Sequence, residues 1–295
     1  MGLSTESLRF AATLRLPKCP SRPLGEEDAA RLLSDQSQGG AAEVIKTTKR
    51  LKAVTEAVDQ LIADQRKNAV TNIAQARLVA TAVHLRSDLG NNEKNQVLRR
   101  WENVTFRIYG MCSKDDHNDA RTAVGDYVRL AWRIVNEKLS ANEILTELSK
   151  IGERVPITKA VENLRKTDCY TDWQEELRYF FGRYEEYLAK KAGQNFDNEQ
   201  WNRIWQGSAA DSIEHILPQS SEKAWIHWLG NLTVLPPRLN SRLGATAPKD
   251  KGDAYTKTGL FVAQEVVVGL PGWGERAILE REANLLEWAR KEWAD

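Results

Sequence analysis

Apolar residues recur three and four positions apart along most of the chain from about Glu26 to Ala192, and runs of alternating β-branched residues are scarce there. A period of about 3.6 residues is typical of amphipathic helices. Ser140 also stands three residues before Glu143 and ahead of Ile144 and Leu148, a spacing at which the serine and glutamate side chains satisfy free backbone donors of a helix start. The pattern therefore predicts a helical N-terminal region, with one helix beginning directly after Ser140.

The distribution of tryptophan changes near residue 170, because eight of the ten tryptophans lie beyond it. A chain of 295 residues is long enough for about two domains, each able to bury a core without disulfides or a structural metal. We therefore expect a helical support or connector domain over residues 1–170 and a second domain over residues 171–295.

The helical period stops within the second domain, where two short apolar segments appear, Ile213–Leu217 and Asn231–Leu235. A polar, tryptophan-bearing loop separates them, so they are predicted to pair as a β-hairpin. Pro236-Pro237 ends the second segment and presets the backbone for a helix start, with Gly244 as its stop. The expected fold is mainly α, with a strand, loop, strand and helix core at about residues 211–245.

Charge and cysteine content limit the classes of function. Lys plus Arg is 42 and Asp plus Glu is 41, so any basic patch has to be local. Cys19, Cys112 and Cys169 are far apart and have no zinc-ligand spacing, which predicts reduced thiols and no zinc site. The sequence has neither an apolar run long enough for a membrane span nor an apolar signal segment at its start, and we expect a cytoplasmic protein.

Three polar residue types stand in otherwise apolar settings around the predicted hairpin. Glu214 and His215 lie in the block Ile213–Gln219, which contains the first strand. Asn231 opens the second strand, and Asn240 lies on the following helix. When a hairpin folds onto such a helix, these side chains can converge on one point. The alternative interpretation is that the histidine and the two asparagines only tie the hairpin to the helix.

This ordered combination resembles the HNH, or ββα-metal (His-Me finger), nuclease motif. The blocks Glu-His-Ile-x-Pro-Gln and Leu-Gly-Asn-Leu-Thr are most similar to the C-terminal nuclease domain of GmrSD-type modification-dependent restriction endonucleases. The resemblance covers about Trp173 to Trp293, and residues 1–170 are only loosely similar to the helical region that precedes the nuclease. The chain departs from the family after Asn240, where Ala247–Lys251 lacks the usual aromatic residue, so the local packing there is not expected to follow the family.

The resemblance implies a role for each residue of the motif. His215 is expected to be the general base that deprotonates water, Glu214 and Asn240 to coordinate one divalent metal ion, and Asn231 to brace the hairpin and orient the base. Phosphodiester hydrolysis needs a deprotonated water, charge neutralisation and stabilisation of the leaving oxygen, which one imidazole and one hard cation supply. Carboxylate and amide oxygens suit Mg²⁺ or Mn²⁺.

A local surplus of positive charge follows the second predicted strand. Between Asn231 and Lys257 there are five basic residues and two acidic ones. We expect four of the basic residues to contact the phosphate backbone of DNA, namely Arg238, Arg242, Lys249 and Lys251; the alternative is a solvated charged surface. His227, between two tryptophans, is expected to contact DNA or to pack within the loop.

The function implied is a metal-dependent DNA endonuclease that acts as the effector part of an antiphage restriction system. One such site cuts one strand, so nicking is the expected product. Family members carry an N-terminal NTPase and sensor domain, and because this sequence has no Walker-type phosphate-binding motif we expect that domain to be absent from the chain. The alternatives are a catalytically inactive helical scaffold that binds DNA or protein, and a ribonuclease.

Overall fold

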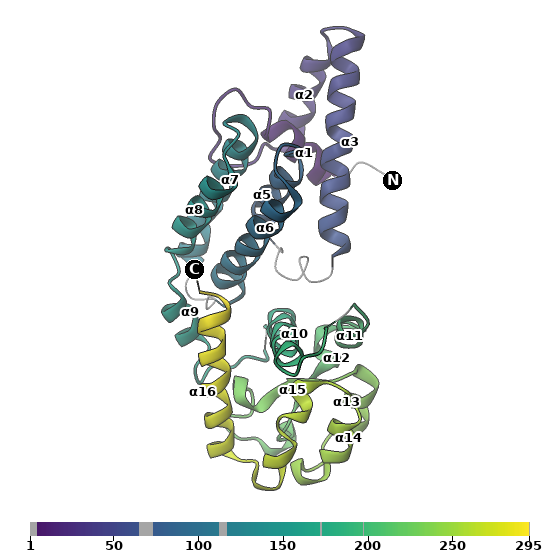
Figure 1. The fold of residues 1–295 in the computed structure, drawn as a ribbon, viewed down its shortest axis with the longest axis vertical. Coiled ribbons are helices and arrows are strands. Elements are labelled where there is room, and N and C mark those ends of the chain that lie inside the picture. The colour runs from purple at the N-terminus through teal and green to yellow at the C-terminus, as the bar shows by residue number, and fades with distance from the viewer. Residues whose placement is uncertain (1–4, 65–72, 112–116, 172, 197, 295) are drawn as a thin grey trace. The chain divides into compact units, whose positions relative to one another are not determined.

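The computed structural model (Figure 1) describes residues 5–64, 73–111, 117–171, 173–196 and 198–294. These residues are mainly helical and include a small two-stranded antiparallel hairpin, as the sequence predicts. Two compact units follow one another along the chain, with unit 1 ending at Pro156 and unit 2 spanning Ile157–Ala294. The separate roles expected for residues 1–170 and 171–295 remain a prediction.

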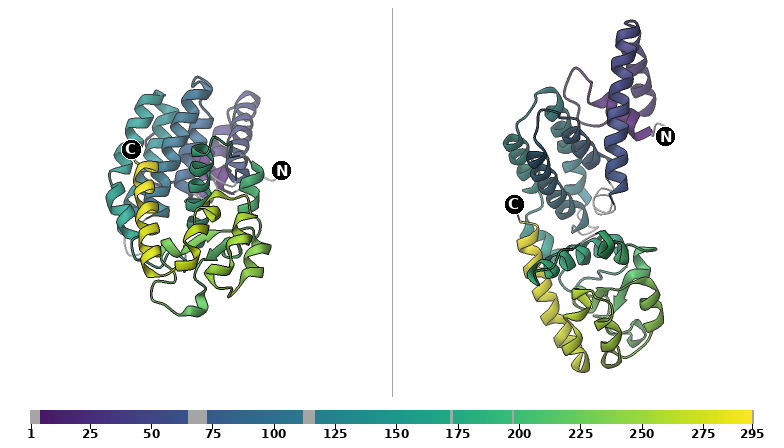
Figure 2. Two further views of the ribbon diagram at one scale, coloured as in Figure 1. Left: turned by 60° about the horizontal axis from the view of Figure 1, so that its bottom comes forward. Right: turned by 45° about the vertical axis from the view of Figure 1, so that its right-hand side comes forward.

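The described part of unit 1 is helical. Helix α5 packs against α7 and α6 against α8, and Figure 2 shows these helices side by side. The predicted capping box is confirmed, because the Ser140 side chain accepts a bond from the Glu143 N–H and the Glu143 carboxylate accepts one from the Ser140 N–H. The elements are α1 (Thr5–Thr13), α2 (Glu26–Ser37), α3 (Ala41–Ala63), α5 (Ala74–His84), α6 (Asn91–Thr105), the π-helical turn η1 (Phe106–Gly110), α7 (His117–Asn136) and α8 (Ala141–Gly152).

Helix α3 buries only the C-terminal part of its apolar stripe. Val54 and Val58 are fully buried, whereas Val44 and Ile45 near its start are exposed. Gly40 immediately precedes the helix with a φ of +97°, a conformation that glycine adopts without steric cost. Gly39 and Gly40 therefore lie between the end of α2 and the start of α3.

Unit 2 contains the hairpin within a set of helices. Its longest helices, α10 and α16, carry large buried side chains, and α10 packs against β2 and α15 while α16 packs against η4 and α9. The elements are α9 (Ile157–Asn163), α10 (Gln174–Lys191), α11 (Asn198–Ile204), α12 (Ala209–Ser212), β1 (Ile213–His215), η3 (Gln219–Ser221), η4 (Leu229–Asn231), β2 (Leu232–Val234), α13 (Pro237–Leu243), η5 (Pro248–Asp250), α14 (Gly252–Thr256), α15 (Phe261–Gln264), η6 (Val267–Gly272) and α16 (Glu275–Glu292).

The strand, loop, strand and helix order is the one the sequence predicts. Strands β1 and β2 pair antiparallel, with Glu214 opposite Thr233 and His215 opposite Leu232. Each strand is shorter than expected, and beyond β1 the Leu217 N–H bonds to the Asn231 side chain instead of to the backbone of the opposite segment. Helix α13 then begins at Pro237 and ends before Gly244. This arrangement places the ends of the hairpin beside α13.

Helix α16 (yellow in Figure 1) holds the start of β2 through two close contacts. A Cβ atom on Gly230 would lie 2.0 Å from the Ile278 carbonyl oxygen, so only glycine permits this approach. Arg281 donates to the carbonyls of Gly230 and Leu232 at 3.0 and 2.6 Å. The position of the hairpin in unit 2 is therefore fixed by backbone contacts with α16.

Candidate active site

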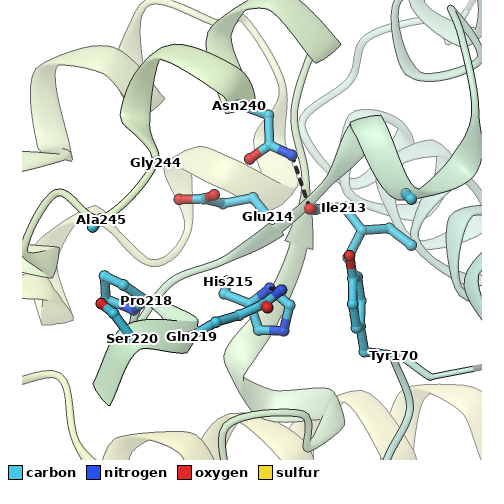
Figure 3. A pocket seen from close by; sticks show the side chains of 11 residues that line it. Tyr170, Ile213, Glu214, His215, Pro218, Gln219, Ser220, Asn240, Gly244 and Ala245 are labelled. Carbon is cyan, nitrogen blue, oxygen red and sulfur yellow. Dashed lines mark hydrogen bonds between the residues drawn. The ribbon is translucent and has the colours of Figure 1, made fainter. Parts of the chain in front are cut away.

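A cleft of about 300 Å³ opens between β1, η3 and α13. Figure 3 shows Glu214, His215 and Asn240 among the side chains that line it. Residues far apart in the sequence meet here, since the wall is completed from before α10 and from after α13. The lining residues are Tyr170, Ala210, Ile213, Glu214, His215, Pro218, Gln219, Ser220, Asn240, Gly244 and Ala245.

Glu214 lies at the centre of β1 and is 4% exposed. Its Oε1 atom accepts hydrogen bonds from Lys251 Nζ at 2.6 Å and from Tyr255 Oη at 2.9 Å. Both of these side-chain hydrogen bonds therefore fall on the same carboxylate oxygen. Burial raises the pKa of Glu214 above its ordinary value, while the neighbouring ammonium acts in the opposite direction. The two side chains thus hold the carboxylate by one oxygen.

Lys251 does not occupy the DNA-contacting position that the sequence analysis assigned to it. The residue is fully buried, and its ammonium donates to Glu214 Oε1 and to the carbonyls of His215 and Ile216. These three acceptors use the three N–H donors of a lysine ammonium. The prediction for Lys251 is therefore wrong: in this structure it is an internal partner of Glu214, out of reach of a DNA phosphate.

Asn240 is anchored by its amide nitrogen. Nδ2 donates to the carbonyls of Asp211 and Ile213 at 2.8 and 2.9 Å. The amide oxygen points toward the carboxylate of Glu214 in Figure 3. Side-chain oxygens from β1 and α13 therefore face the same part of the cleft. Across the described part of the chain, no three His, Cys, Asp or Glu residues gather into a metal-binding cluster.

His215 has a partner on each ring nitrogen. Nε2 lies 2.9 Å from Nδ1 of His227, and Nδ1 lies 3.1 Å from Nε2 of Gln219. Burial lowers the pKa of His215 to about 3, with further lowering from His227 and Lys251. The ring is consequently neutral at pH 7 and keeps one unprotonated nitrogen, as a general base requires.

Asn231 is fully buried and links both ends of the loop between the strands. Its amide oxygen accepts from the Leu217 N–H at 2.9 Å and from Trp273 Nε1 at 3.1 Å. Its amide nitrogen donates to the carbonyls of Leu217 and Ile226 at 3.1 and 2.8 Å. The Asn231 amide thus pairs with the backbone N–H and C=O of Leu217, as a backbone group of the opposite strand would. These bonds hold the turn that follows His215.

Comparison with known proteins identifies unit 2. Residues 157–288 match the family model described as GmrSD restriction endonucleases, C-terminal domain. Residues 157–288 belong to this domain family. No curated protein and no solved structure matches the chain. The match indicates that this part of the chain is a restriction endonuclease domain. Such a domain implies DNA as the substrate. Among the helices described, none has the length and apolar character needed to cross a bilayer.

A basic groove lies beside the cleft of the GmrSD C-terminal domain. It has a volume of about 610 Å³, is lined by Arg238 and Arg242 from α13, and shares Asn240 with the cleft. Lys249 is exposed on η5. Two of the four predicted DNA-contacting residues therefore line a groove adjoining the cleft, Lys249 is on the surface, and Lys251 is internal.

The GmrSD C-terminal domain also brings to His215 residues to which the sequence analysis gave no catalytic role. The Tyr170 ring meets His215 edge-on with centroids 4.6 Å apart, and it stacks on His227 at 5.3 Å. Gln219 and His227 contact the two ring nitrogens of His215. Gln219 lies within the Glu-His-Ile-x-Pro-Gln block, and so had a sequence signal. His227 was expected only to contact DNA or to pack within the loop, and Tyr170 had no sequence signal, because contacts with His215 depend on where the loops pass.

Proposed function

We propose that the GmrSD C-terminal domain of this chain is a divalent-metal-dependent DNA endonuclease whose active site is the cleft lined by Glu214, His215 and Asn240. The observation that carries this proposal is their convergence. The side chains of Glu214, His215 and Asn240 line one cleft, and Asn240 also lines the adjoining groove that carries Arg238 and Arg242. In this proposal they serve as a general base, two metal ligands and a phosphate-binding surface.

Glu214 and Asn240 fit the coordination preferences of a hard cation. Mg²⁺ is commonly held by one or two protein oxygens together with water and substrate phosphate. Glu214 Oε2 and Asn240 Oδ1 supply such oxygens, and Lys251 fixes the carboxylate in one orientation. When bound, the ion would neutralise charge on the phosphate and stabilise the leaving oxygen. The absence of cysteine among the cleft-lining residues agrees with Mg²⁺ or Mn²⁺ as the expected ion.

His215 takes the proton from the attacking water in this proposal. Its Nδ1 atom lies 3.1 Å from Nε2 of Gln219, another residue that lines the cleft, and its lowered pKa keeps the imidazole neutral at pH 7. Asn231 acts indirectly, by holding the turn that connects β1 to η3. The proposal assigns these residues the roles that the family resemblance implies, with Asn231 as a support of the base.

DNA would lie along the groove that continues from the cleft. Arg238 and Arg242 line this groove, and Lys249 adds a third exposed charge on η5. Phosphate contacts position a duplex without reading its sequence. We therefore propose that the domain nicks DNA with little sequence preference and without a nucleotide, as the effector part of an antiphage restriction system. Recognition of the target would be the task of an NTPase and sensor domain.

A plasmid assay tests the proposal. Supercoiled plasmid is incubated with the protein and Mg²⁺ or Mn²⁺, and with EDTA in parallel. We expect conversion to the nicked form only in the presence of metal. His215→Ala should lower the rate by about 10² to 10⁴, the usual contribution of a general base, while His84→Ala in unit 1 serves as the matched control with near wild-type activity.

Other outcomes of the same assay would assign a different function. A folded wild-type protein that leaves DNA intact under all metal conditions is an inactive scaffold. Cleavage of RNA but not of plasmid DNA would indicate a ribonuclease. A loss of less than about tenfold in His215→Ala would mean that the imidazole is not the general base. Nicks confined to one short sequence would place recognition within this chain.

A further inference from the structure

We propose that His227 is a positioning residue for the general base: it accepts the Nε2–H of His215 and so keeps Nδ1 of His215 unprotonated on the cleft side. This inference rests on the proposed function, in which His215 Nδ1 takes a proton from water. It adds to the motif a second histidine, which comes from the loop between the strands.

The hydrogen-bond chain fixes the tautomers of both rings. The Gln219 amide nitrogen lies 3.1 Å from His215 Nδ1, and an amide nitrogen only donates. His215 Nδ1 is therefore the acceptor. A neutral imidazole carries one N–H, which must then be on Nε2 and point at His227 Nδ1, 2.9 Å away. His227 in turn carries its proton on Nε2.

A separate segment holds His227 in this position. Tyr170 stacks on the His227 ring with an interplanar angle of 11° and meets His215 edge-on at 70°. The Cys169 N–H donates to the His227 carbonyl at 2.9 Å. Asp168 Oδ1 accepts from the N–H groups of Tyr170 and Thr171 at 2.8 Å each, which fixes the turn that presents the tyrosine. The second histidine is thus supported by both its backbone and its ring.

The arrangement also accounts for the proton taken up during the reaction. Protonation of His215 at Nδ1 gives an imidazolium with two N–H groups, and the Nε2–H continues to donate to His227. No proton has to pass to His227. The Gln219 amide donates to His215 Nδ1 in this structure, and the attacking water would donate to the same nitrogen in the reaction.

Two substitutions separate hydrogen bonding from packing. His227→Asn retains an acceptor close to the position of Nδ1 but removes the ring that stacks on Tyr170. His227→Phe retains a stacking ring but removes the acceptor. If His227 positions the base, His227→Phe should lower kcat about 10- to 100-fold, the range usual for an orienting partner, with little change in KM, and His227→Asn should stay close to wild type. The reverse order of activities would show a packing role and overturn the proposal.

Nitrogen NMR of the ¹⁵N-histidine-labelled, metal-free full chain tests the tautomer directly. In the wild type we expect His215 Nδ1 to be unprotonated and Nε2 to be protonated at pH 7. The His227→Phe protein, checked for an unchanged fold by circular dichroism, should give a mixture of the two tautomers. A wild-type His215 protonated on Nδ1 would overturn this inference whatever the activity, whereas a wild-type protein that does not cleave would overturn the proposed function.

Discussion

Lys251 Nζ lies 2.6 Å from Glu214 Oε1, in a pair whose lysine is fully buried and whose carboxylate side chain is 5% exposed. The two residues are distant in the sequence, and they meet because the Lys251 side chain, from between η5 and α14, reaches β1 and also donates to the carbonyls of His215 and Ile216. A buried pair gives little net stability relative to an apolar pair, but removing one partner leaves an uncompensated charge. Lys251 therefore provides the charge partner that allows the Glu214 carboxylate, the proposed metal ligand, to be buried.

Lys251→Met is expected to destabilise the protein by about 3–5 kcal/mol, because Glu214 is left as a buried charge without its ammonium partner. Urea denaturation measures the change. Lys251→Met combined with Glu214→Gln should recover part of the loss, since the charge is then removed as well; full recovery is not expected, because two backbone carbonyls also lose their donor. Equal losses in the single and double variants would contradict the coupling.

Glu214→Ala and Asn240→Ala should each raise the Mg²⁺ concentration needed for half-maximal nicking, and excess Mg²⁺ should restore activity only in part. Each substitution removes one oxygen that faces the cleft. A magnesium titration of plasmid nicking measures the effect. Ser220→Ala, which changes another lining residue of the cleft, is the control and should titrate like wild type. A variant whose titration matches wild type would remove that residue from the proposed ligand set.

Asn231→Ala should lower the free energy of unfolding by about 3 kcal/mol or more, as well as the rate of nicking. The substitution removes four hydrogen bonds and leaves buried backbone and indole groups unpaired, each at a cost of about 1–3 kcal/mol. Asn284→Ala, at an exposed position of α16, is the matched control and should change stability little. An unchanged melting temperature for Asn231→Ala would exclude the bracing role.

Arg238→Ala and Arg242→Ala should weaken binding to duplex DNA and reduce its salt dependence. Each phosphate contact contributes about 0.9 to the slope of log affinity against log salt, so each variant should lower the slope by about one. Fluorescence anisotropy in EDTA measures binding without cleavage. Arg276→Ala, a highly exposed arginine on α16 that does not line the groove, should leave the slope unchanged. If Arg238→Ala and Arg242→Ala have the same salt-dependence slope as wild type, DNA does not bind along this groove.

The pKa of His215 predicts how stability depends on pH. The pKa is lowered to about 3 in the folded chain from an ordinary value of 6.5, so between these values the unfolded chain binds a proton that the folded chain does not. Wild-type stability should therefore fall as the pH decreases from 6.5 toward 3, with a slope approaching about 1.4 kcal/mol per pH unit from this group. His215→Gln should lack this contribution. Parallel stability curves for the two proteins in metal-free buffer would contradict the shift.

Much of the local structure could be predicted from the sequence, because it depends on residues close together in the chain. The capping box at Ser140 satisfies backbone donors within one helical turn, and Pro237 and Gly244 bound α13 through their own backbone preferences. The hairpin followed from two apolar segments and a proline pair. Periodicity was less reliable for burial, since Val44 and Ile45 on α3 continue an apolar stripe and are nevertheless exposed.

The helices, the hairpin and the candidate residues Glu214, His215, Asn231 and Asn240 could be predicted from local sequence patterns and from the order of these residues in the chain. The partners of these side chains depend on the tertiary structure. Lys251 belongs to a basic segment that resembles a DNA-binding surface, yet its ammonium is internal, where its three N–H groups donate to Glu214 Oε1 and to the carbonyls of His215 and Ile216. Pairing between distant side chains depends on the path of the loops, which local residue preferences do not specify.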